Sequence, residues 1–284
     1  MLQLRQSYFS CSQFGLPPID LARPQSLAEL SEIWDYPSAA PCYLAGGTDL
    51  FIQFREGLRP ELIVDINEIE QLVEINKTAE HLTIGSGVRH NDGICHPSVK
   101  GSLPGMDIAW ALIGNVRIRG MGTLGGNLMA RRPRYEGPIL AAALNAELNF
   151  LNPSGTSLAM IEDVWDGNIT PGALLISINI PLYGSPRLAY DRSLRPTMTI
   201  AVVIEESENG GFSGRAVVGS EWDQPVLLPL DLRGSKNLRE VVSSAREISR
   251  TAFLNLPETV ADAGYKRDAG ASLLTRLLVQ LGES

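Results

Sequence analysis

Two glycine-rich segments constrain this chain of 284 residues more than any other feature. They read Ala45-Gly46-Gly47-Thr48-Asp49-Leu50 and Gly122-Thr123-Leu124-Gly125-Gly126-Asn127-Leu128. Glycine adopts positive φ without strain and lets the main chain approach a ligand closely, and consecutive main-chain N–H groups in a turn form a concave anion-binding site. Two such turns on either side of one ligand would suit the diphosphate of a dinucleotide. Each segment alone is also compatible with an ordinary turn, and neither has the spacing of a Rossmann or P-loop motif.

The sequence around these segments predicts short strands mixed with helices. A helix is expected after Ser26, its N-cap, because Leu27, Leu30, Ile33 and Trp34 share one helical face. The residues that follow the first glycine segment, 51–54, are read as either helix or strand. Strands are predicted at 42–45, 61–66, 72–75, 81–84, 147–151 and 174–180, and helices at 106–113 and 139–144.

A domain boundary is placed at 184–186, where Gly, Ser and Pro follow one another. Beyond it, β-rich runs at 187–194, 199–205 and 214–218, with a turn signal at 209–211, predict antiparallel strands. Helices are expected at 238–253 and at the end of the chain. The final helix carries a leucine stripe that predicts a core-facing surface rather than a partner zipper; its members are Leu273, Leu274, Leu277, Leu278 and Leu281.

Composition excludes several classes of protein. A chain with 44% hydrophobic and 20% charged residues is an ordinary globular protein, long enough for two or three packed units. Its net charge of −8 argues against a nucleic-acid partner. There is no run of about eighteen apolar residues to span a membrane and no signal-peptide pattern in 1–16, so we expect a cytoplasmic location.

Metal-binding and acid–base motifs are not recognisable in the sequence. Cys11, Cys42 and Cys95 lack C-x-x-C spacing, so neither an iron–sulfur cluster nor a zinc site is predicted. The histidines have no ligand spacing either, and His90 and His96 are interpreted as surface residues of a Gly/Asn/Asp-rich loop, with a metal site as the alternative. We therefore predict no metal ligand and no catalytic side chain, and assign the chemistry to a cofactor.

Five segments, taken together, resemble the FAD-binding medium subunit of the molybdenum hydroxylases, a family that includes the flavin subunits of carbon monoxide dehydrogenase and xanthine dehydrogenase. The resemblance implies an α+β fold: a two-part FAD-binding domain of the PCMH type, similar to vanillyl-alcohol oxidase, at 1–184, with parts at about 1–58 and 59–184. A C-terminal domain of antiparallel strands packed with helices would follow at 185–284. The segments are 45–50, 62–66, 84–88, 118–127 and 178–181.

The resemblance also implies which residues bind the cofactor. The first glycine segment should lie along the FAD diphosphate and ribityl chain, and the second should face the diphosphate from the other side. Leu175 or Ile176 would supply main-chain contact, and Tyr190 would lie beside the isoalloxazine or else serve as a core aromatic. The cofactor-binding residues so implied are Ala45, Gly46, Gly47, Thr48, Asp49, Leu50, Thr123, Gly126, Asn127, Glu136, Ile176 and Tyr190.

The chain departs from the family pattern after the second glycine segment. The family usually has small residues there, followed by Pro-x-x-Asp. Here Arg131 and Arg132 come before Pro133, Arg134 follows it, and Glu136 stands at the usual aspartate position. Downstream, Asp191-Arg192 stands where a lysine or similar base is common. The arginines are interpreted as a solvated loop, as contacts to cofactor phosphates, or as a surface that docks a partner subunit.

The function implied is that of an FAD-carrying electron-transfer subunit. Its partners would be a large subunit with the molybdenum cofactor and a small subunit with [2Fe-2S] clusters, with a dimer of heterotrimers left open. Electrons would pass from the clusters through FAD to NAD, oxygen or a quinone. The alternatives are a stand-alone FAD-dependent oxidase or reductase, and a flavin-free subunit that keeps the fold for assembly.

Overall fold

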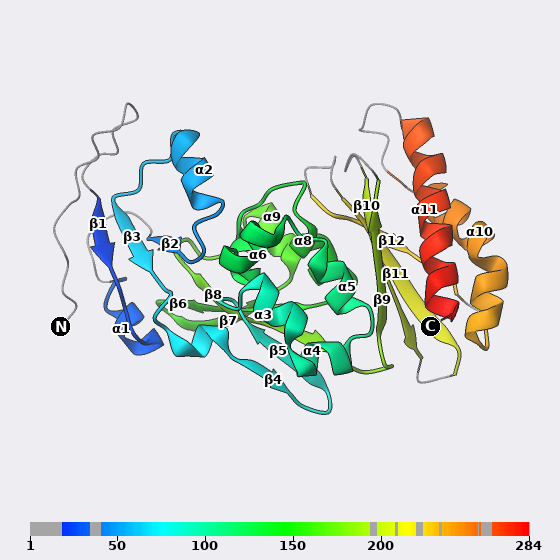
Figure 1. The fold of residues 1–284 in the computed structure, drawn as a ribbon, viewed down its shortest axis with the longest axis horizontal. Coiled ribbons are helices and arrows are strands. Elements are labelled where there is room, and N and C mark those ends of the chain that lie inside the picture. The colour runs from blue at the N-terminus through cyan, green and yellow to red at the C-terminus, as the bar shows by residue number, and fades with distance from the viewer. Residues whose placement is uncertain are drawn as a thin grey trace.

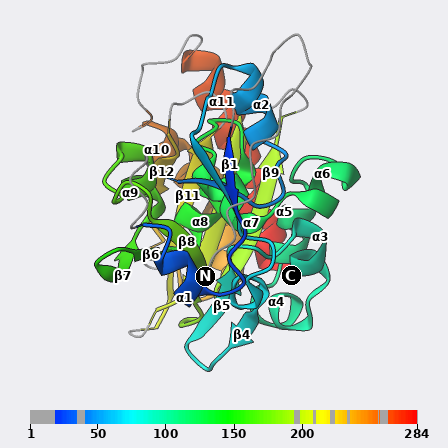
Figure 2. The same ribbon diagram turned by 90° about the vertical axis from the view of Figure 1, so that its left-hand side faces the viewer.

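The computed structural model describes residues 19–34, 41–193, 198–207, 210–219, 224–232, 235–254, 256 and 263–283. Three sheets follow one another along the longest axis of the molecule (Figure 1). Turned by 90°, the N-terminal elements face the viewer and the C-terminal helices lie behind them (Figure 2). No helix within the described ranges is long and apolar enough to cross a membrane.

The first sheet is parallel and has the order β1-β3-β2, formed by Asp20–Ala22, Leu62–Asp65 and Cys42–Leu44. Helix α1 (Leu27–Ser31) begins as predicted, because Ser26 accepts a hydrogen bond from the Glu29 N–H. Helix α2 (Leu50–Arg55) follows the first glycine segment, so the helical alternative for 51–54 is confirmed. Since β3 completes this sheet, the proposed first part of the FAD domain would have to extend beyond residue 58 to Asp65.

The second sheet is antiparallel, in the order β4-β5-β8-β6-β7. Its central strand β8 (Leu174–Pro181) is the run of apolar and β-branched residues that the sequence marks most clearly. The prediction of a strand over 72–75 is wrong at its start, because Leu72 and Val73 belong to the 3₁₀ turn η1 (Glu70–Val73). The other strands are β4 (Ile75–Lys77), β5 (His81–Gly85), β6 (Glu147–Asn152) and β7 (Gly155–Ala159).

Short helices cover this sheet, and α8 is the most deeply buried of them. All eight residues of α8 (Glu136–Ala143) are buried, as expected for a helix that is apolar on every side. The helix also lies close to the third sheet, since a Cβ on Gly219 would come within 2.3 Å of Ile139. The remaining helices are α3 (His90–Cys95), α4 (Pro97–Ser102), α5 (Met106–Ala111), α6 (Val116–Met121), α7 (Leu124–Met129) and α9 (Ile161–Asp166).

The third sheet is antiparallel, in the order β12-β11-β10-β9, which confirms the prediction for the C-terminal strands. Side chains alternate along β10: Ile200 and Val202 pack toward the C-terminal helices, whereas Ala201 and Val203 join the core of the second sheet. The sheet is therefore buried on both faces. Its strands are β9 (Arg187–Arg192), β10 (Thr199–Glu206), β11 (Phe212–Gly219) and β12 (Val226–Pro229).

Two long helices, α10 (Leu238–Leu254) and α11 (Ala263–Glu283), cover the outer face of the third sheet (Figure 1). Leu274, Leu277, Leu278 and Leu281 are buried there, and Leu273 packs against them, so the leucine stripe is core. The α+β class and the antiparallel C-terminal sheet with helices are thus as predicted. All strands of the third sheet come from beyond residue 184, and on that basis we keep 1–184 and 185–284 as proposed domains.

Candidate functional site

The two glycine segments meet at one cavity of about 280 Å³. Its walls come from the start of α2, from α6 and α7, and from residues near the start of α8. The residues of the first segment and four of the second line it, together with both charged and apolar side chains. The lining is Ala45, Gly46, Gly47, Thr48, Asp49, Leu50, Ile52, His90, Ile113, Gly114, Ile118, Gly122, Thr123, Gly126, Asn127, Arg134, Tyr135, Glu136 and Arg192.

The first glycine segment presents open main-chain donors to this cavity. The N–H groups of Gly46, Gly47 and Thr48 donate to no described residue. Gly47 has a φ of +70°, which only glycine adopts without strain. A Cβ on Gly46 would lie 2.0 Å from the carbonyl oxygen of Met121, so this glycine lets the two segments touch. The segment therefore has the character of an anion-binding turn.

The second glycine segment does not have that character, which corrects the expectation of open N–H groups there. It forms helix α7, with Thr123 as the N-cap: the Thr123 Oγ1 accepts from the Gly126 N–H at 3.1 Å. The Leu124 N–H donates to Val88, and the Gly125 N–H donates to Ser86. Gly125 is required for packing, since a Cβ would lie 2.6 Å from that of Ser86. Gly126 instead faces open space, where a Cβ would meet only Thr123 Oγ1, at 3.0 Å.

Asn127 and Glu136 connect the cavity to α8. The Asn127 Oδ1 accepts from the Gly137 N–H at 2.9 Å, in the first turn of α8. Glu136 is 7% exposed, and its Oε1 accepts from Arg192 Nη1 at 3.1 Å. Burial raises the pKa of Glu136 above its ordinary value, although the cation of Arg192 acts in the opposite direction. Glu136, which stands where an aspartate is usual, therefore pairs with Arg192, which stands where a lysine or similar base is common.

The carboxylate of Asp49 is occupied by hydrogen bonds within the chain. It accepts from Arg132 Nε (3.0 Å), Tyr135 Oη (2.9 Å) and Gln53 Nε2 (2.6 Å). Arg132 also donates to both oxygens of Glu56, at 3.2 and 2.7 Å. Burial, and then the hydrogen bond to Asp49, raise the pKa of Tyr135 to about 12. These contacts tie α2 to the segment that follows α7 and so hold one wall of the cavity.

The three arginines after the second glycine segment therefore act separately. Arg131, with a φ of +50°, donates to the carbonyl oxygen of Trp165 at 2.6 Å. Arg132 binds the carboxylates of Asp49 and Glu56. Arg134 lines the cavity, is exposed and has no ion pair with the described residues. Only Arg134 has the placement expected of a cation that meets a bound anion.

His90 is buried, which corrects its interpretation as a surface histidine. It is the first residue of α3, is 1% exposed and lines the cavity. Its Nδ1 accepts from Trp110 Nε1 at 2.7 Å. Burial, with a smaller effect of Arg119, lowers the pKa of His90 to about 4, so that the imidazole is neutral at pH 7. His96 has another role, since its Nδ1 accepts from the Ser98 N–H at the start of α4.

Ile176 and Tyr190 are not among the residues that line the cavity. The carbonyl oxygen of Ile176 accepts from the N–H of Ser86, the residue after β5, at 3.0 Å, and Ser86 in turn accepts from the Gly125 N–H of α7. Tyr190 packs in the core of the second sheet, and its buried hydroxyl has no hydrogen-bond partner among the described residues. Burial, reinforced by Glu136, raises the pKa of Tyr190.

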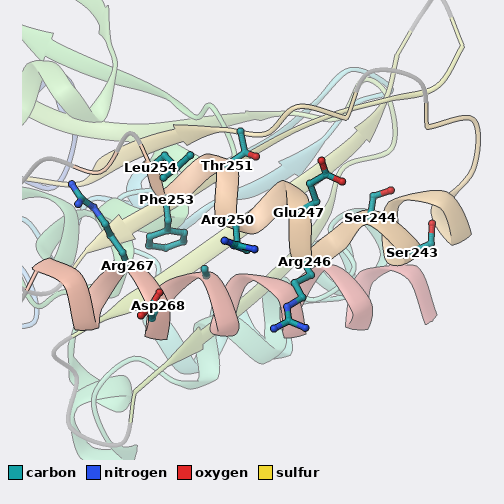
Figure 3. Close-up of a pocket in the computed structure, with 11 residues that line it drawn as sticks. Ser243, Ser244, Arg246, Glu247, Arg250, Thr251, Phe253, Leu254, Arg267 and Asp268 are labelled. Carbon is teal, nitrogen blue, oxygen red and sulfur yellow. The ribbon is translucent and has the colours of Figure 1, made fainter.

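A second hollow lies between α10 and α11 (Figure 3). Its volume is larger, about 680 Å³, and the close-up shows Arg246, Arg250 and Arg267 projecting from the two helices. Glu247 and Asp268 also line it, so its lining carries three cationic and two anionic side chains. It contains none of the glycine-segment residues, and the smaller cavity remains the candidate site.

Comparison with known proteins identifies the family of this chain. The family model described as the FAD binding domain in molybdopterin dehydrogenase matches residues 14–183, more than half of the chain. The glyceraldehyde dehydrogenase medium chain of Sulfolobus acidocaldarius is 29% identical over 192 residues, 64% of this chain and 68% of the relative. The carbon monoxide dehydrogenase medium chain of Hydrogenophaga pseudoflava is 26% identical over 276 residues, 92% and 96% of the two chains.

The fold has close neighbours among solved structures. In quinoline 2-oxidoreductase from Pseudomonas putida 86, a chain superposes with a TM-score of 0.81 and 21% identity, covering 94% of this chain and 98% of that one. At this identity, the likeness concerns the fold.

Proposed function

The chain belongs to the family of FAD-binding domains of molybdopterin dehydrogenases, and we propose that it passes electrons through FAD from [2Fe-2S] clusters of a partner subunit to an external acceptor. It is the medium, FAD-carrying type of subunit of a molybdenum hydroxylase, an oxidoreductase. The observation that carries the proposal is the cavity lined by both glycine segments, where the N–H groups of 46–48 donate to no described residue and Gly126 has no side chain to occupy space.

The residues of the cavity fit a dinucleotide diphosphate. Phosphate oxygens accept hydrogen bonds, and the N–H groups of 46–48 are available donors. Gly126 leaves space in the second segment, and Arg134 adds a positive charge that forms no ion pair with the described residues. We therefore assign the diphosphate to the first glycine segment, with Gly126 as the close-approach position of the second.

The remaining residues implied by the family resemblance have supporting roles in this proposal. Thr123 and Asn127 fix α7 and α8 through hydrogen bonds within the chain, and Asp49 holds α2 against the segment around Tyr135. They would preserve the shape of the cavity rather than provide most of the binding contacts. Glu136, paired with Arg192, places a charged pair at the cavity wall beside Tyr190.

FAD supplies the redox chemistry when bound, since a flavin exchanges electrons both singly and in pairs. The chain contributes binding, orientation and electrostatics. Its sequence contains three cysteines, one fewer than the four thiolates that usually hold a [2Fe-2S] cluster. We therefore propose that the clusters and the molybdenum cofactor reside on a small and a large partner subunit. The two alternatives, a stand-alone flavin enzyme and a flavin-free assembly subunit, remain as outcomes of the test.

Isolation of the native protein tests this proposal. The expected result is a complex with a larger polypeptide and a cluster-containing one, with FAD, iron and molybdenum in fixed ratio to this chain. Flavin in this chain that is reduced by a substrate without partners would favour the stand-alone enzyme. A colourless complex with iron and molybdenum would favour the flavin-free subunit. A chain that runs alone and contains none of the three cofactors would contradict the proposal.

A further inference from the structure

We propose that His90 is an additional cofactor-binding residue, whose imidazole Nε2–H donates a hydrogen bond to a phosphate oxygen of the ligand in the glycine cavity. This inference rests on the proposed function, since the ligand is taken to be FAD. The sequence shows no sign of it, because His90 stands outside both glycine segments.

The main chain of His90 is fixed to the second glycine segment. Its N–H donates to the carbonyl oxygen of Gly122 at 3.1 Å, and the neighbouring Arg89 forms a bridge with Thr123. The side chain is 1% exposed, yet it lines the cavity. A Cβ on Gly122 would lie 3.3 Å from His90 Cδ2 and 3.4 Å from Thr48 Oγ1. The edge of the imidazole that carries Nε2 is therefore close to the open turn of the first segment.

Trp110 sets the tautomer of His90. An indole N–H is only a donor, so the 2.7 Å hydrogen bond from Trp110 Nε1 requires His90 Nδ1 to be an unprotonated acceptor. In a neutral imidazole, the proton must then be on Nε2. That N–H has no partner among the described residues. This donor belongs to a side chain that lines the cavity, so an acceptor oxygen of a ligand there would satisfy it.

Packing holds the indole in place. Trp110 is fully buried, and its ring lies against Gly93 of α3, where a Cβ would come within 2.2 Å of Trp110 Cη2. Gly93 is one helical turn from His90, so the absence of a side chain there lets the indole reach Nδ1. Gly93, Trp110 and His90 thus form one arrangement that presents a neutral donor to the cavity, with Trp110 as a positioning residue.

The expected ligand group is acceptor-only, as a phosphate oxygen is. The donors that converge on the cavity are main-chain N–H groups, the Nε2–H of His90 and the side chain of Arg134. A neutral donor beside these groups binds an anion without adding a buried charge.

The test is an equilibrium titration of the flavin-free full-length chain with FAD, followed by flavin fluorescence. His90→Leu removes the donor, and His90→Gln keeps an amide N–H close to the position of Nε2. We expect a Kd about tenfold higher in His90→Leu and within about threefold of wild type in His90→Gln. Equal Kd values in all three proteins, at unchanged melting temperatures, would overturn the inference while leaving FAD binding intact. No FAD binding by the wild type would instead refute the proposed function.

A spectroscopic measurement covers the case in which His90→Leu does not fold. The chain has three histidines, and ¹⁵N-histidine spectra of the wild type and of His90→Gln identify the signals of His90. We expect an Nε2-protonated tautomer whose Nε2–H resonance moves when FAD is added. Trp110→Phe is expected to change the tautomer ratio and weaken FAD binding. An Nδ1-protonated tautomer, or an Nε2–H resonance that FAD leaves in place, would overturn the inference.

Discussion

The Gly126→Ala substitution should leave the flavin-free chain at least as stable as the wild type but weaken its affinity for FAD. Gly126 lies in α7 with ordinary helical φ, and its added methyl group would meet only Thr123 Oγ1, at 3.0 Å. Alanine is favoured over glycine inside a helix by about 1 kcal/mol. We therefore expect the free energy of unfolding of the flavin-free chain to stay the same or rise by up to about 1 kcal/mol.

The effect on FAD affinity should have the opposite sign. The methyl group would be added to a residue that lines the cavity, where the main chain is expected to approach the diphosphate. Forcing an extra methyl group into a closely packed contact costs about 1–3 kcal/mol, which is about a 5- to 150-fold increase in Kd. The assay is a fluorescence titration with FAD, combined with urea unfolding of the flavin-free protein.

Gly120→Ala is the matched control. Gly120 lies in the neighbouring helix α6, is exposed like Gly126, and its Cβ would meet only Asn91 Nδ2, at 3.7 Å. It should leave the Kd for FAD unchanged. Gly47→Ala is less informative, because its φ of +70° would strain the fold directly. Wild-type affinity for FAD in Gly126→Ala would refute the placement of the ligand against α7.

Two further predictions concern single side chains around the cavity. The pKa of His90 is about 4 in the folded chain against 6.5 in the unfolded chain, so the unfolded state takes up a proton first as the pH falls. The free energy of unfolding should therefore decrease between pH 6.5 and 4, by up to about 3 kcal/mol. Urea unfolding of His90→Gln should show a shallower pH dependence than that of the wild type. Arg132→Ala should lower the free energy of unfolding by about 1 kcal/mol, because it removes a partly exposed ion pair with Asp49. Arg134→Ala should instead weaken FAD binding, most strongly at low salt, and leave the free energy of unfolding unchanged. Thermal melts and FAD titrations of both variants check this. Arg132→Ala that lost only FAD affinity, or Arg134→Ala that lost only stability, would contradict the assignment.

Regular elements were predictable from the sequence where burial has a simple period. β8 is a continuous apolar run, and α11 carries its leucines on one face, so both could be located correctly. The apolar character of Leu72 favours a strand, but it does not show which groups its main chain meets in the fold. The Leu72 N–H donates to Ile69, which closes a 3₁₀ turn, and the Leu72 carbonyl oxygen accepts from Gly87. Such pairings depend on segments that meet only in the fold.

The candidate site was predicted in its location but not in its division of roles. Both glycine segments line the cavity, yet whether an N–H group is open depends on distant carbonyl oxygens, such as those of Val88 and Ser86 that occupy the second segment. For the same reason, three nearby arginines have different roles: Arg131 donates to a carbonyl oxygen, Arg132 binds two carboxylates, and Arg134 has no ion pair with the described residues. The burial of His90 follows from Trp110, twenty residues away, and no local pattern in the sequence reveals it.

The central claim is that the glycine cavity binds the diphosphate of a dinucleotide, and a comparison of FAD with FMN tests it most directly. FMN carries the same flavin ring but only one phosphate and no adenylate. Flavin-free wild-type chain should bind FAD at one molecule per chain, and FMN at least about tenfold more weakly, or about 1.4 kcal/mol. Equal affinity for the two flavins would show that the donors of Gly46, Gly47 and Thr48 do not recognise a diphosphate, and would contradict the account.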